Sequence, residues 1–407
     1  MEFVADFHIH TKYSRATSKD MNIDYLSNFA KIKGIDLLGT GDITHPLWVG
    51  ELKKKLKPLG TGLFSYNNTN FILTGEVASI YSWNGETKRI HNIIFAPNFE
   101  SVERINAVLS RYGKLASDGR PILSISARDL IKIVLDISWD CFIVPAHAWT
   151  PWFSMFGSNS GFDSIEECFG DYAKYIFAIE TGLSSDPPMN WRLSMLDRIT
   201  LISNSDAHSP DKIAREANVF NSAMNYYDIK NTLEHKNTSK FLYTIEFFPE
   251  EGKYHYDGHR VCDVRFSPKE TKKHNGICPK CGRKLTIGVM NRVEQLADRE
   301  ENYVPSRAIP YKHLVPLLEI VSSVYKKDSS SKQVELEYRR ILQKGYSELQ
   351  ILLKMPREEM LKFIPEKIAD GILKVRTGKI KAEPGYDGVF GKIDVLEEEK
   401  ENQLSLF

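Results

Sequence analysis

The sequence lacks any run of about 18 consecutive apolar residues, so we expect no membrane-spanning helix. The N-terminus lacks a basic stretch followed by an apolar one, which argues against a secretory signal peptide. The net charge is only +1, so any site for a polyanion must be local. Cysteine is scarce, with 5 in 407 residues, and three lie within residues 262–281. That grouping favours a metal cluster in a reducing cytoplasm over a disulfide framework.

Residues 1–240 alternate short apolar runs with amphipathic segments. The runs end at polar clusters and read FVADFHIH, IDLLGTGD, NFILTGEVAS, HNIIFAP, CFIVPAHA, FAIET and ITLISNSDAH. Their continuous apolar character is typical of strands buried on both faces, as in a parallel sheet or barrel. The intervening segments IDYLSNFAKIKG and ARDLIKIVLD indicate helices. We therefore predict an α/β domain resembling a (β/α) barrel, with about seven strands.

The composition changes after residue 240. Residues 241–290, here called the Cys/His module, are basic and rich in glycine, cysteine and histidine. Residues 291–395 are predicted to form a helical DNA-binding domain, with AIPYKHLVPLLEIVSSVY as one helical segment. Ser347 and Gln350 form a capping-box pattern at the start of another helix. Residues 396–407 are predicted to be a flexible, charged tail with an apolar tip.

Histidines and acids gather at the ends of the predicted strands. In a (β/α) barrel these positions meet at one rim, where active sites form. Imidazole and carboxylate groups suit zinc, manganese or iron. The alternative is a set of separate structural residues, each hydrogen-bonded on its own. These histidine and acid side chains are more numerous than the ligands of one tetrahedral ion. We therefore predict two or three metals. The candidate catalytic and metal-binding residues are His8, His10, Asp42, His45, Glu76, His91, His147, Asp206 and His208.

The ordered motifs HIH, GDITH, GE, IHN, PAH and SDAH resemble those of the PHP (polymerase and histidinol phosphatase) superfamily. The resemblance implies a distorted (β/α)7 barrel that hydrolyses phosphoesters with up to three metals. It assigns one metal to His8, His10, Glu76 and Asp206, and a second, bridged by Glu76, to His91 and His147. Asp42, His45 and His208 are the candidates for a third.

The stretch KYSRA stands where many PHP relatives carry a further acid or histidine. Arg15 in that stretch is a candidate phosphate contact, because guanidinium binds phosphate oxygens bidentately. The alternative is an ordinary surface arginine.

The Cys/His module contains His259-x-x-Cys262 and Cys278-x-x-Cys281. Two such pairs have the spacing of a structural zinc site. His255 and His274 are alternative ligands nearby, and a coincidental or redox-active CxxC pair is the other interpretation. Lysines and arginines crowd the module, which suits a DNA backbone but also an ordinary solvated face.

Two segments are predicted to be rim loops that contact the substrate. AWTPWFSMFGSNSGF follows His147, and its aromatic residues are candidates for stacking on a base or wedging into a duplex. Packing on the barrel itself is the alternative. TGLSSDPPMNWR follows the predicted strand FAIET, and its small polar residues are candidates for reading a base edge. The candidate substrate-binding residues of the two loops are Trp149, Trp152, Phe153, Glu180, Ser184, Ser185 and Asp186.

The last five residues, QLSLF, are similar to the peptide with which bacterial DNA enzymes dock into the sliding clamp. That similarity implies a polar contact by Gln403 and an apolar pocket filled by Leu404, Leu406 and Phe407. It also implies a bacterial source. The alternative is a frayed terminus.

Taken together, the PHP-like motifs, CPKCG, NRVEQLADRE and EPGYDGVFGK make the whole chain resemble the endonuclease Q family. The resemblance implies nicking of DNA 5′ to uracil, hypoxanthine, xanthine or an abasic site, with 3′-hydroxyl and 5′-phosphate products. It implies damaged DNA as partner, structural and active-site Zn²⁺, and activation by Mg²⁺ or Mn²⁺. We expect a monomer in the cytoplasm, associated with the nucleoid. The alternatives are a PHP phosphatase for a small phosphomonoester and a non-catalytic DNA-binding accessory protein.

Overall fold

The computed structural model describes residues 1–395, and its centre is an 11-stranded mixed sheet. The main hydrogen-bonded path runs β15-β12-β11-β1-β2-β5-β4-β3, with β6 and β7 paired to β5 and β8 paired to β6. The strands are β1 Glu2–Asp6, β2 Leu37–Gly39, β3 Lys57–Pro58, β4 Phe64–Tyr66, β5 Thr69–Trp83, β6 Glu86–Ala96, β7 Ile122–Leu123, β8 Phe142–Pro145, β11 Ala217–Asn221, β12 Phe241–Glu246 and β15 Tyr311–His313. The predicted clamp-binding residues Gln403, Leu404, Leu406 and Phe407 lie outside the described residues.

Each of the seven predicted apolar runs contains a strand, and the last two strands, β9 (Ala178–Glu180) and β10 (Thr200–Ile202), form a separate parallel pair. Two backbone contacts connect that pair to the large sheet: the amide of Ala148 donates to the carbonyl of Glu180 at 2.9 Å, and Ile9 bridges Ala207 in parallel. These contacts bring the strand ends together. The hydrogen-bonded sheet is open, so a closed barrel stays a prediction.

The expectation of a parallel arrangement is wrong for β6, which is antiparallel to both β5 and β8. β5 and β6 are joined by Asn84 and Gly85 alone, and both residues have positive φ, 49° and 81°. An Asn-Gly pair in this conformation closes a two-residue hairpin, because its twist matches that of the strands. The dipeptide within SWNGE is the signal that marks this turn.

Helices cover the sheet, and the two that the sequence predicts in residues 1–240 are confirmed. α1 begins after Asn22, whose side chain accepts two backbone N–H groups, and ends at Gly34, with φ 91°. α4 turns Leu130, Ile131 and Val134 into the core. The main helices are α1 Ile23–Lys33, α2 Pro46–Lys55, α3 Phe99–Leu109, α4 Ala127–Ile137 and α7 Tyr226–Glu234, with the short α5 Ile165–Phe169 and α6 Pro187–Trp191. No helix among residues 1–395 is long and apolar enough to span a membrane.

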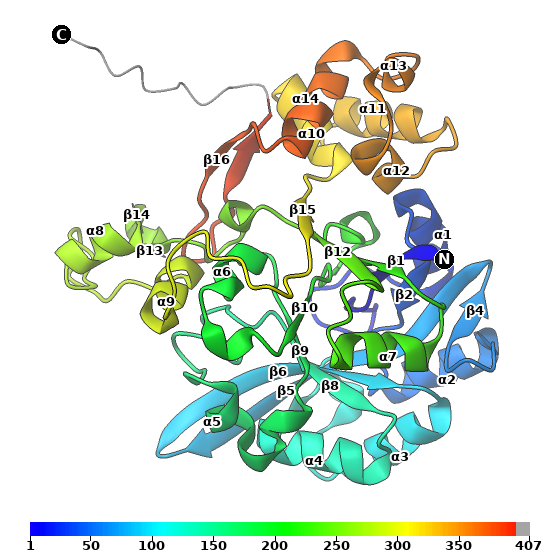
Figure 1. Cartoon of the computed structure of the whole chain (residues 1–407), viewed down its shortest axis with the longest axis vertical. Helices are drawn as coiled ribbons and strands as arrows, with labels where there is room; N and C mark the ends of the chain where they lie inside the picture. The colour runs from blue at the N-terminus through cyan, green and yellow to red at the C-terminus, as the bar shows by residue number, and fades with distance from the viewer. Residues whose placement is uncertain (396–407) are drawn as a thin grey trace.

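Residues 291–395 contain a group of helices at the top of Figure 1. The segment AIPYKHLVPLLEIVSSVY is not a single helix, because β15 occupies its first half and only α10 its second. Pro316 precedes α10 and lacks the N–H that a continuing helix needs, so the strand and the helix separate there. The capping box of Ser347 and Gln350 is present. The helices are α10 Leu317–Tyr325, α11 Lys332–Leu342, α12 Glu348–Leu353, α13 Arg357–Met360 and α14 Glu366–Arg376.

The predicted start of the Cys/His module at residue 241 is too early, because β12 (Phe241–Glu246) is a strand of the central sheet. The name is kept for residues 257–287, which project from the side of the sheet domain (Figure 1). Its two strands form an antiparallel hairpin over a small core of Val264, Cys278 and Leu285. Because this core buries little apolar surface, the module depends on another source of stability. Its elements are β13 Asp257–His259, β14 Val264–Phe266 and α8 Pro268–Lys273, followed by α9 Val289–Leu296.

A buried ion pair joins α1 to the C-terminal helices. The ammonium of Lys33 lies 2.7 Å from the carboxylate of Glu348, and their side chains are 3% and 4% exposed. That carboxylate also accepts from the amide of Leu317 and the hydroxyl of Tyr338. The four groups therefore form one network, which ties distant segments together.

We predict that Lys33→Met lowers the free energy of unfolding by about 3–5 kcal/mol, because Glu348 is left buried without its cation. Chemical denaturation followed by circular dichroism measures the change. Lys132→Met is the control, since Lys132 pairs with Asp136 in solvent and its loss should leave the free energy of unfolding almost unchanged. Equal stability losses in the two variants would contradict the prediction.

Candidate metal centre

Four side chains meet where β1 and β10 end and where the middle of β5 passes beside them. His8 and His10 follow β1 and, two residues apart in extended backbone, point to the same side. The Nε2 atom of His10 lies 3.2 Å from Glu76 Oε2 and 3.1 Å from Asp206 Oδ1. The Nε2 atom of His8 lies 3.6 Å and 3.7 Å from the same two oxygens. These are the four residues that the resemblance to the PHP superfamily assigns to one metal.

Three of these converging atoms are buried without a hydrogen-bond partner: His8 Nε2, His10 Nε2 and Asp206 Oδ1. Buried polar atoms are rarely left unpaired, because each loses its hydration. Imidazole nitrogens and carboxylate oxygens that face one another at 3–4 Å leave room for a divalent cation between them. The donor set therefore fits a metal ion.

Glu76 connects this group to a second one. Its Oε1 atom lies 2.7 Å from His91 Nδ1 and 3.0 Å from His147 Nε2, while Oε2 faces the first group. A third group consists of His10, Asp206 and His208, whose potential ligand atoms lie within 4.8 Å of one another. The three groups share members, so we call their seven residues the histidine–carboxylate cluster; they are His8, His10, Glu76, His91, His147, Asp206 and His208.

Two further acids orient the histidines from behind. Glu180 Oε1 lies 3.0 Å from His8 Nδ1, and Asp42 Oδ1 lies 3.3 Å from His10 Nδ1. Asp42 also accepts hydrogen bonds from the backbone of Thr11 and from Ser14. A carboxylate on one ring nitrogen fixes the tautomer, so the other nitrogen is free to bind metal. Asp42 lies behind the cluster, and Ser14 of the KYSRA stretch supports it.

The backbone at the cluster is strained. Asp42, His147 and Asp206 have φ of 49°, 29° and 46°, in the left-handed region that non-glycine residues seldom adopt. Such conformations cost of order 1–3 kcal/mol each and persist where surrounding contacts enforce them. Three of them at one site support a functional role for it.

The charges of the cluster shift its pKa values. Burial alone would lower the pKa of His8, but the Glu180 carboxylate and then that of Glu76 raise it well above its usual value. Burial would raise the pKa of Glu76, but the charges of His91 and Arg120 hold it well below its usual range. The Glu76 carboxylate is therefore ionised at neutral pH, as cation binding requires.

Several residues predicted for the site lie elsewhere. His45 stacks on Tyr13 with ring centroids 4.3 Å apart and belongs to none of the three groups. The side chain of Arg15 is 79% exposed and pairs with Asp118. The contacts of both side chains are thus with residues outside the cluster, Tyr13 for His45 and Asp118 for Arg15.

The rim loops are only partly directed at the site. Trp149 is buried, donates to Asn190 at 2.7 Å and packs in the core. Glu180 is buried behind His8, while Ser185 donates to Thr181 and Asp186 caps α6. Only three of the predicted loop residues line the cavity described next: Trp152, Phe153 and Ser184.

A cavity of about 740 Å³ opens over the histidine–carboxylate cluster. Sequence reasoning missed its basic residues, of which Arg120 lies 3.2 Å from Glu76. Arg120 precedes β7 in SDGRPIL, a segment without a chemical motif, so only folding identifies it. The lining residues that matter here are His91, His147, Asp206, His208, Arg120, Lys212, Arg215, Lys253, Trp152, Phe153, Ser184, Tyr254 and Phe390.

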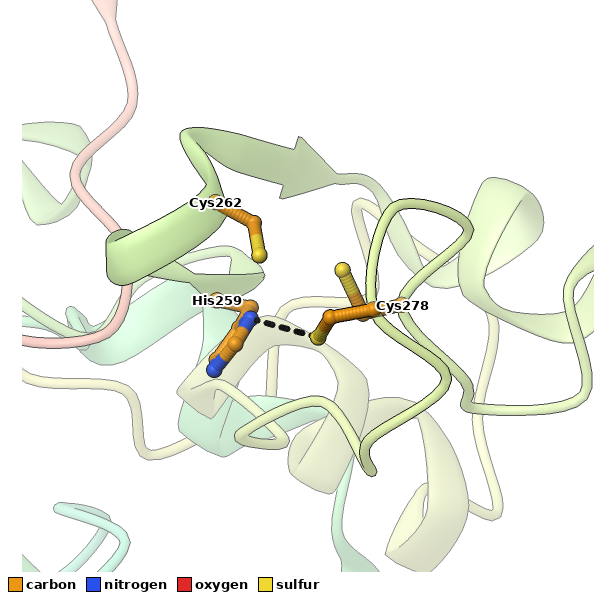
Figure 2. A group of neighbouring side chains, drawn as sticks. His259, Cys262 and Cys278 are labelled. Carbon is orange, nitrogen blue, oxygen red and sulfur yellow. Dashed lines mark hydrogen bonds between the residues drawn. The ribbon is translucent and has the colours of Figure 1, made fainter.

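The Cys/His module brings four potential ligands together: the relevant atoms of His259, Cys262, Cys278 and Cys281 lie within 4.8 Å of one another. Figure 2 shows His259, Cys262 and Cys278 directed at one point. Burial opposes ionisation of Cys278, but the backbone N–H groups that follow it lower its pKa to about 6. Three thiols and one imidazole fit a tetrahedral metal site.

The two alternative histidines lie outside this group. His274 stacks on Phe266, with ring centroids 4.7 Å apart, and His255 is buried against Tyr256. The prediction of His259 as the fourth ligand therefore agrees with the geometry.

Comparison with known proteins gives matches along the whole chain. Residues 316–379 match the family model of the MJ0043 C-terminal domain. The uncharacterised protein MJ0043 of Methanocaldococcus jannaschii is 34% identical over 255 residues, which are 61% of this chain. This chain spans only 31% of MJ0043. The uncharacterised protein YqxK of Bacillus subtilis is 29% identical over 96% of this chain and 98% of its own length.

Two crystal structures match almost completely. The lesion-specific endonuclease PfuEndoQ of Pyrococcus furiosus has a TM-score of 0.86 and 32% identity, over 100% of both chains. Endonuclease Q bound to a 27-mer duplex with an abasic lesion at its active site has a TM-score of 0.87 and 32% identity, over 98% of this chain. On this full-length likeness in sequence and structure, the chain belongs to the endonuclease Q family.

Proposed function

We propose that the protein is a metal-dependent DNA repair endonuclease that hydrolyses the phosphodiester 5′ to deaminated bases and abasic sites. The observation that carries the proposal is the histidine–carboxylate cluster at the base of a cavity lined by cations and aromatic rings. An endonuclease Q of the same fold was crystallised with an abasic duplex at its active site. The products would carry 3′-hydroxyl and 5′-phosphate ends.

Divalent cations held by the three groups would supply Lewis acidity at the phosphoryl oxygens and neutralise the charge that develops there. The best-defined holders are His8, His10 and Asp206 for one ion, and His91 and His147 for another, with Glu76 between them. Zn²⁺ suits this donor set, and Mg²⁺ or Mn²⁺ are alternatives for activity. Glu180 and Asp42 keep the histidine rings in the orientation that binding needs.

The residues that line the cavity would bind the substrate. The guanidinium of Arg120 is suited to a phosphate oxygen, and Lys212 and Arg215 to the neighbouring backbone. Trp152 offers a ring for stacking a base that has left the helix. Flipping costs less for a base that pairs poorly, such as uracil opposite guanine, which favours lesions over normal DNA.

The Cys/His module would bind one structural zinc through His259, Cys262, Cys278 and Cys281. A site with four protein ligands has no open position for chemistry. The free energy of zinc binding would instead supply the stability that the small apolar core of the module cannot provide.

The test uses end-labelled duplexes that carry one uracil, hypoxanthine, xanthine or abasic site, with an undamaged duplex as control, in Mg²⁺ or Mn²⁺. We expect one cut on the 5′ side of each lesion and none in the control. Release of phosphate from a small ester without strand cleavage would favour the phosphatase alternative. Binding without either reaction would favour an accessory protein.

We predict that Arg120→Met lowers kcat/KM for a lesion duplex about a hundredfold, because a cation beside the reacting phosphate is lost. Single-turnover cleavage measures the effect. Arg128→Met is the matched control, since Arg128 is half exposed and pairs with Asp171 on the surface. An Arg120→Met rate within twofold of the control would exclude Arg120 from phosphate binding.

We also propose that QLSLF binds a bacterial sliding clamp through Gln403, Leu404, Leu406 and Phe407. Deleting residues 403–407 should leave nicking unchanged but end co-migration with such a clamp in gel filtration. A chain with scrambled residues 403–407 is the control for length. Undiminished clamp binding by the deleted chain would refute this assignment.

A further inference from the structure

The loop between β16 (Lys381–Glu383) and β17 (Lys392–Asp394) contributes Phe390 to the lining of the cavity. It comprises residues 384–391, PGYDGVFG, and Figure 1 shows β16 running from the C-terminal helices down toward the Cys/His module. Backbone hydrogen bonds fasten the loop beside the cavity. Gly385 donates to Glu250 at 2.7 Å, and Gly388 donates to Lys253 at 3.0 Å.

The other side of the loop is held by the metal-binding part of the Cys/His module. The amide of Arg260 donates to Asp387 at 2.7 Å, and the hydroxyl of Tyr386 donates to Asp263 at 2.6 Å. Arg260 and Asp263 flank the potential ligand Cys262. Because metal binding would fix this short segment, the metal site would help to hold the loop in place.

The loop presents Phe390 at the mouth of the cavity over the histidine–carboxylate cluster. Phe390 as a residue is 52% exposed, and the ammonium of Lys253 lies 4.4 Å from the centroid of its ring. On the same cavity, Trp152 is 36% exposed and meets Tyr254 edge to face. Exposed aromatic rings among cations match the surface of proteins that stack single-stranded bases while lysines attract the backbone.

We infer that Phe390 stacks on a base of the damaged duplex at the cavity mouth, and that the Cys/His module serves to hold it there. The inference rests on the proposed function, because the partner is DNA opened at a lesion. Lys212, Arg215 and Lys253 line the same mouth and would attract the phosphates on either side. The module thereby contributes to lesion recognition without a catalytic metal of its own.

The test measures binding apart from cleavage, by fluorescence anisotropy with an abasic duplex and an undamaged duplex of the same sequence. Phe390→Ala should raise the Kd for the abasic duplex about tenfold and leave the Kd for undamaged DNA unchanged, because only opened DNA offers a base face. Phe390→Trp should retain wild-type affinity. Tyr386→Phe, which removes the hydroxyl bound to Asp263, should shift the Kd in the same direction as Phe390→Ala, by a smaller factor.

Val389→Ala is the matched control, since Val389 is the adjacent exposed residue and does not line the cavity. The inference is overturned if Phe390→Ala binds the abasic duplex within twofold of wild type, or if it weakens both duplexes equally. Because affinity is measured separately, a wild-type protein that binds lesions without cutting them contradicts the proposed function alone. A wild-type protein that cuts while Phe390→Ala binds normally contradicts this inference alone.

Discussion

Glu76→Gln should reduce nicking of lesion duplexes at least a thousandfold, because one side chain serves two groups of potential ligands. Its Oε2 atom faces His10 at 3.2 Å and its Oε1 atom faces His91 at 2.7 Å. The amide has the same shape but no charge and only one acceptor oxygen. It therefore weakens both metals that would stabilise the reacting phosphate, and each such interaction is worth a factor of about 10²–10³ in rate.

Metal content distinguishes this explanation from loss of folding. Elemental analysis of purified Glu76→Gln should show a loss of two ions, whereas His208→Ala, which belongs to one group only, should lose one. Glu86→Gln is the control, because Glu86 is an exposed residue of β6 paired with Lys88. Circular dichroism should be the same for all three variants. A Glu76→Gln protein with full metal content and full activity would remove the cluster from the mechanism.

The second large effect concerns the Cys/His module, where Cys278→Ser should remove one zinc per chain and unfold residues of the module. Cys278 is 1% exposed and belongs both to the four-residue group and to the small core with Val264 and Leu285. Zinc binding in comparable peptides supplies about 10–16 kcal/mol, far more than so small a core can. Without bound zinc, few interactions stabilise the fold of the module.

Hydrogen exchange measures this loss segment by segment. Amides of residues 257–287 should lose protection in Cys278→Ser, while those of β1, β2 and β5 keep it. Cys141→Ala is the matched control, since Cys141 is a buried cysteine of the sheet domain outside the group. It should keep the zinc and the protection of the module. Unchanged exchange and zinc content in Cys278→Ser would show that the four residues form no metal site.

The local patterns of the sequence predicted much of the architecture. Each apolar run contains a strand, and the capping box of Ser347 and Gln350 forms as expected. The failures also have local causes. The Asn84–Gly85 turn reversed β6, and Pro316 separated β15 from α10. Each of these elements depends on residues within a few positions of one another in the chain, so a short stretch of sequence is enough to predict it.

The sequence also predicted which residues gather as potential metal ligands. His8 and His10 share a face because their spacing is that of extended backbone, and the CPKCG turn brings Cys278 and Cys281 together. Histidine and cysteine have few substitutes as metal ligands, so their type and spacing alone indicate metal chemistry.

Only the tertiary structure decided which side chains support the ligands and which surround the substrate. Glu180 reaches His8 across 172 positions, and Arg120 reaches Glu76 across 44. Phe390 arrives at the cavity on a loop held by contacts more than 100 positions away, such as that between Asp387 and Arg260. Such contacts leave no periodicity or motif, because they depend on how whole strands and loops pack. The sequence by itself therefore predicted a metal site, and only folding decided which other side chains surround the potential ligands.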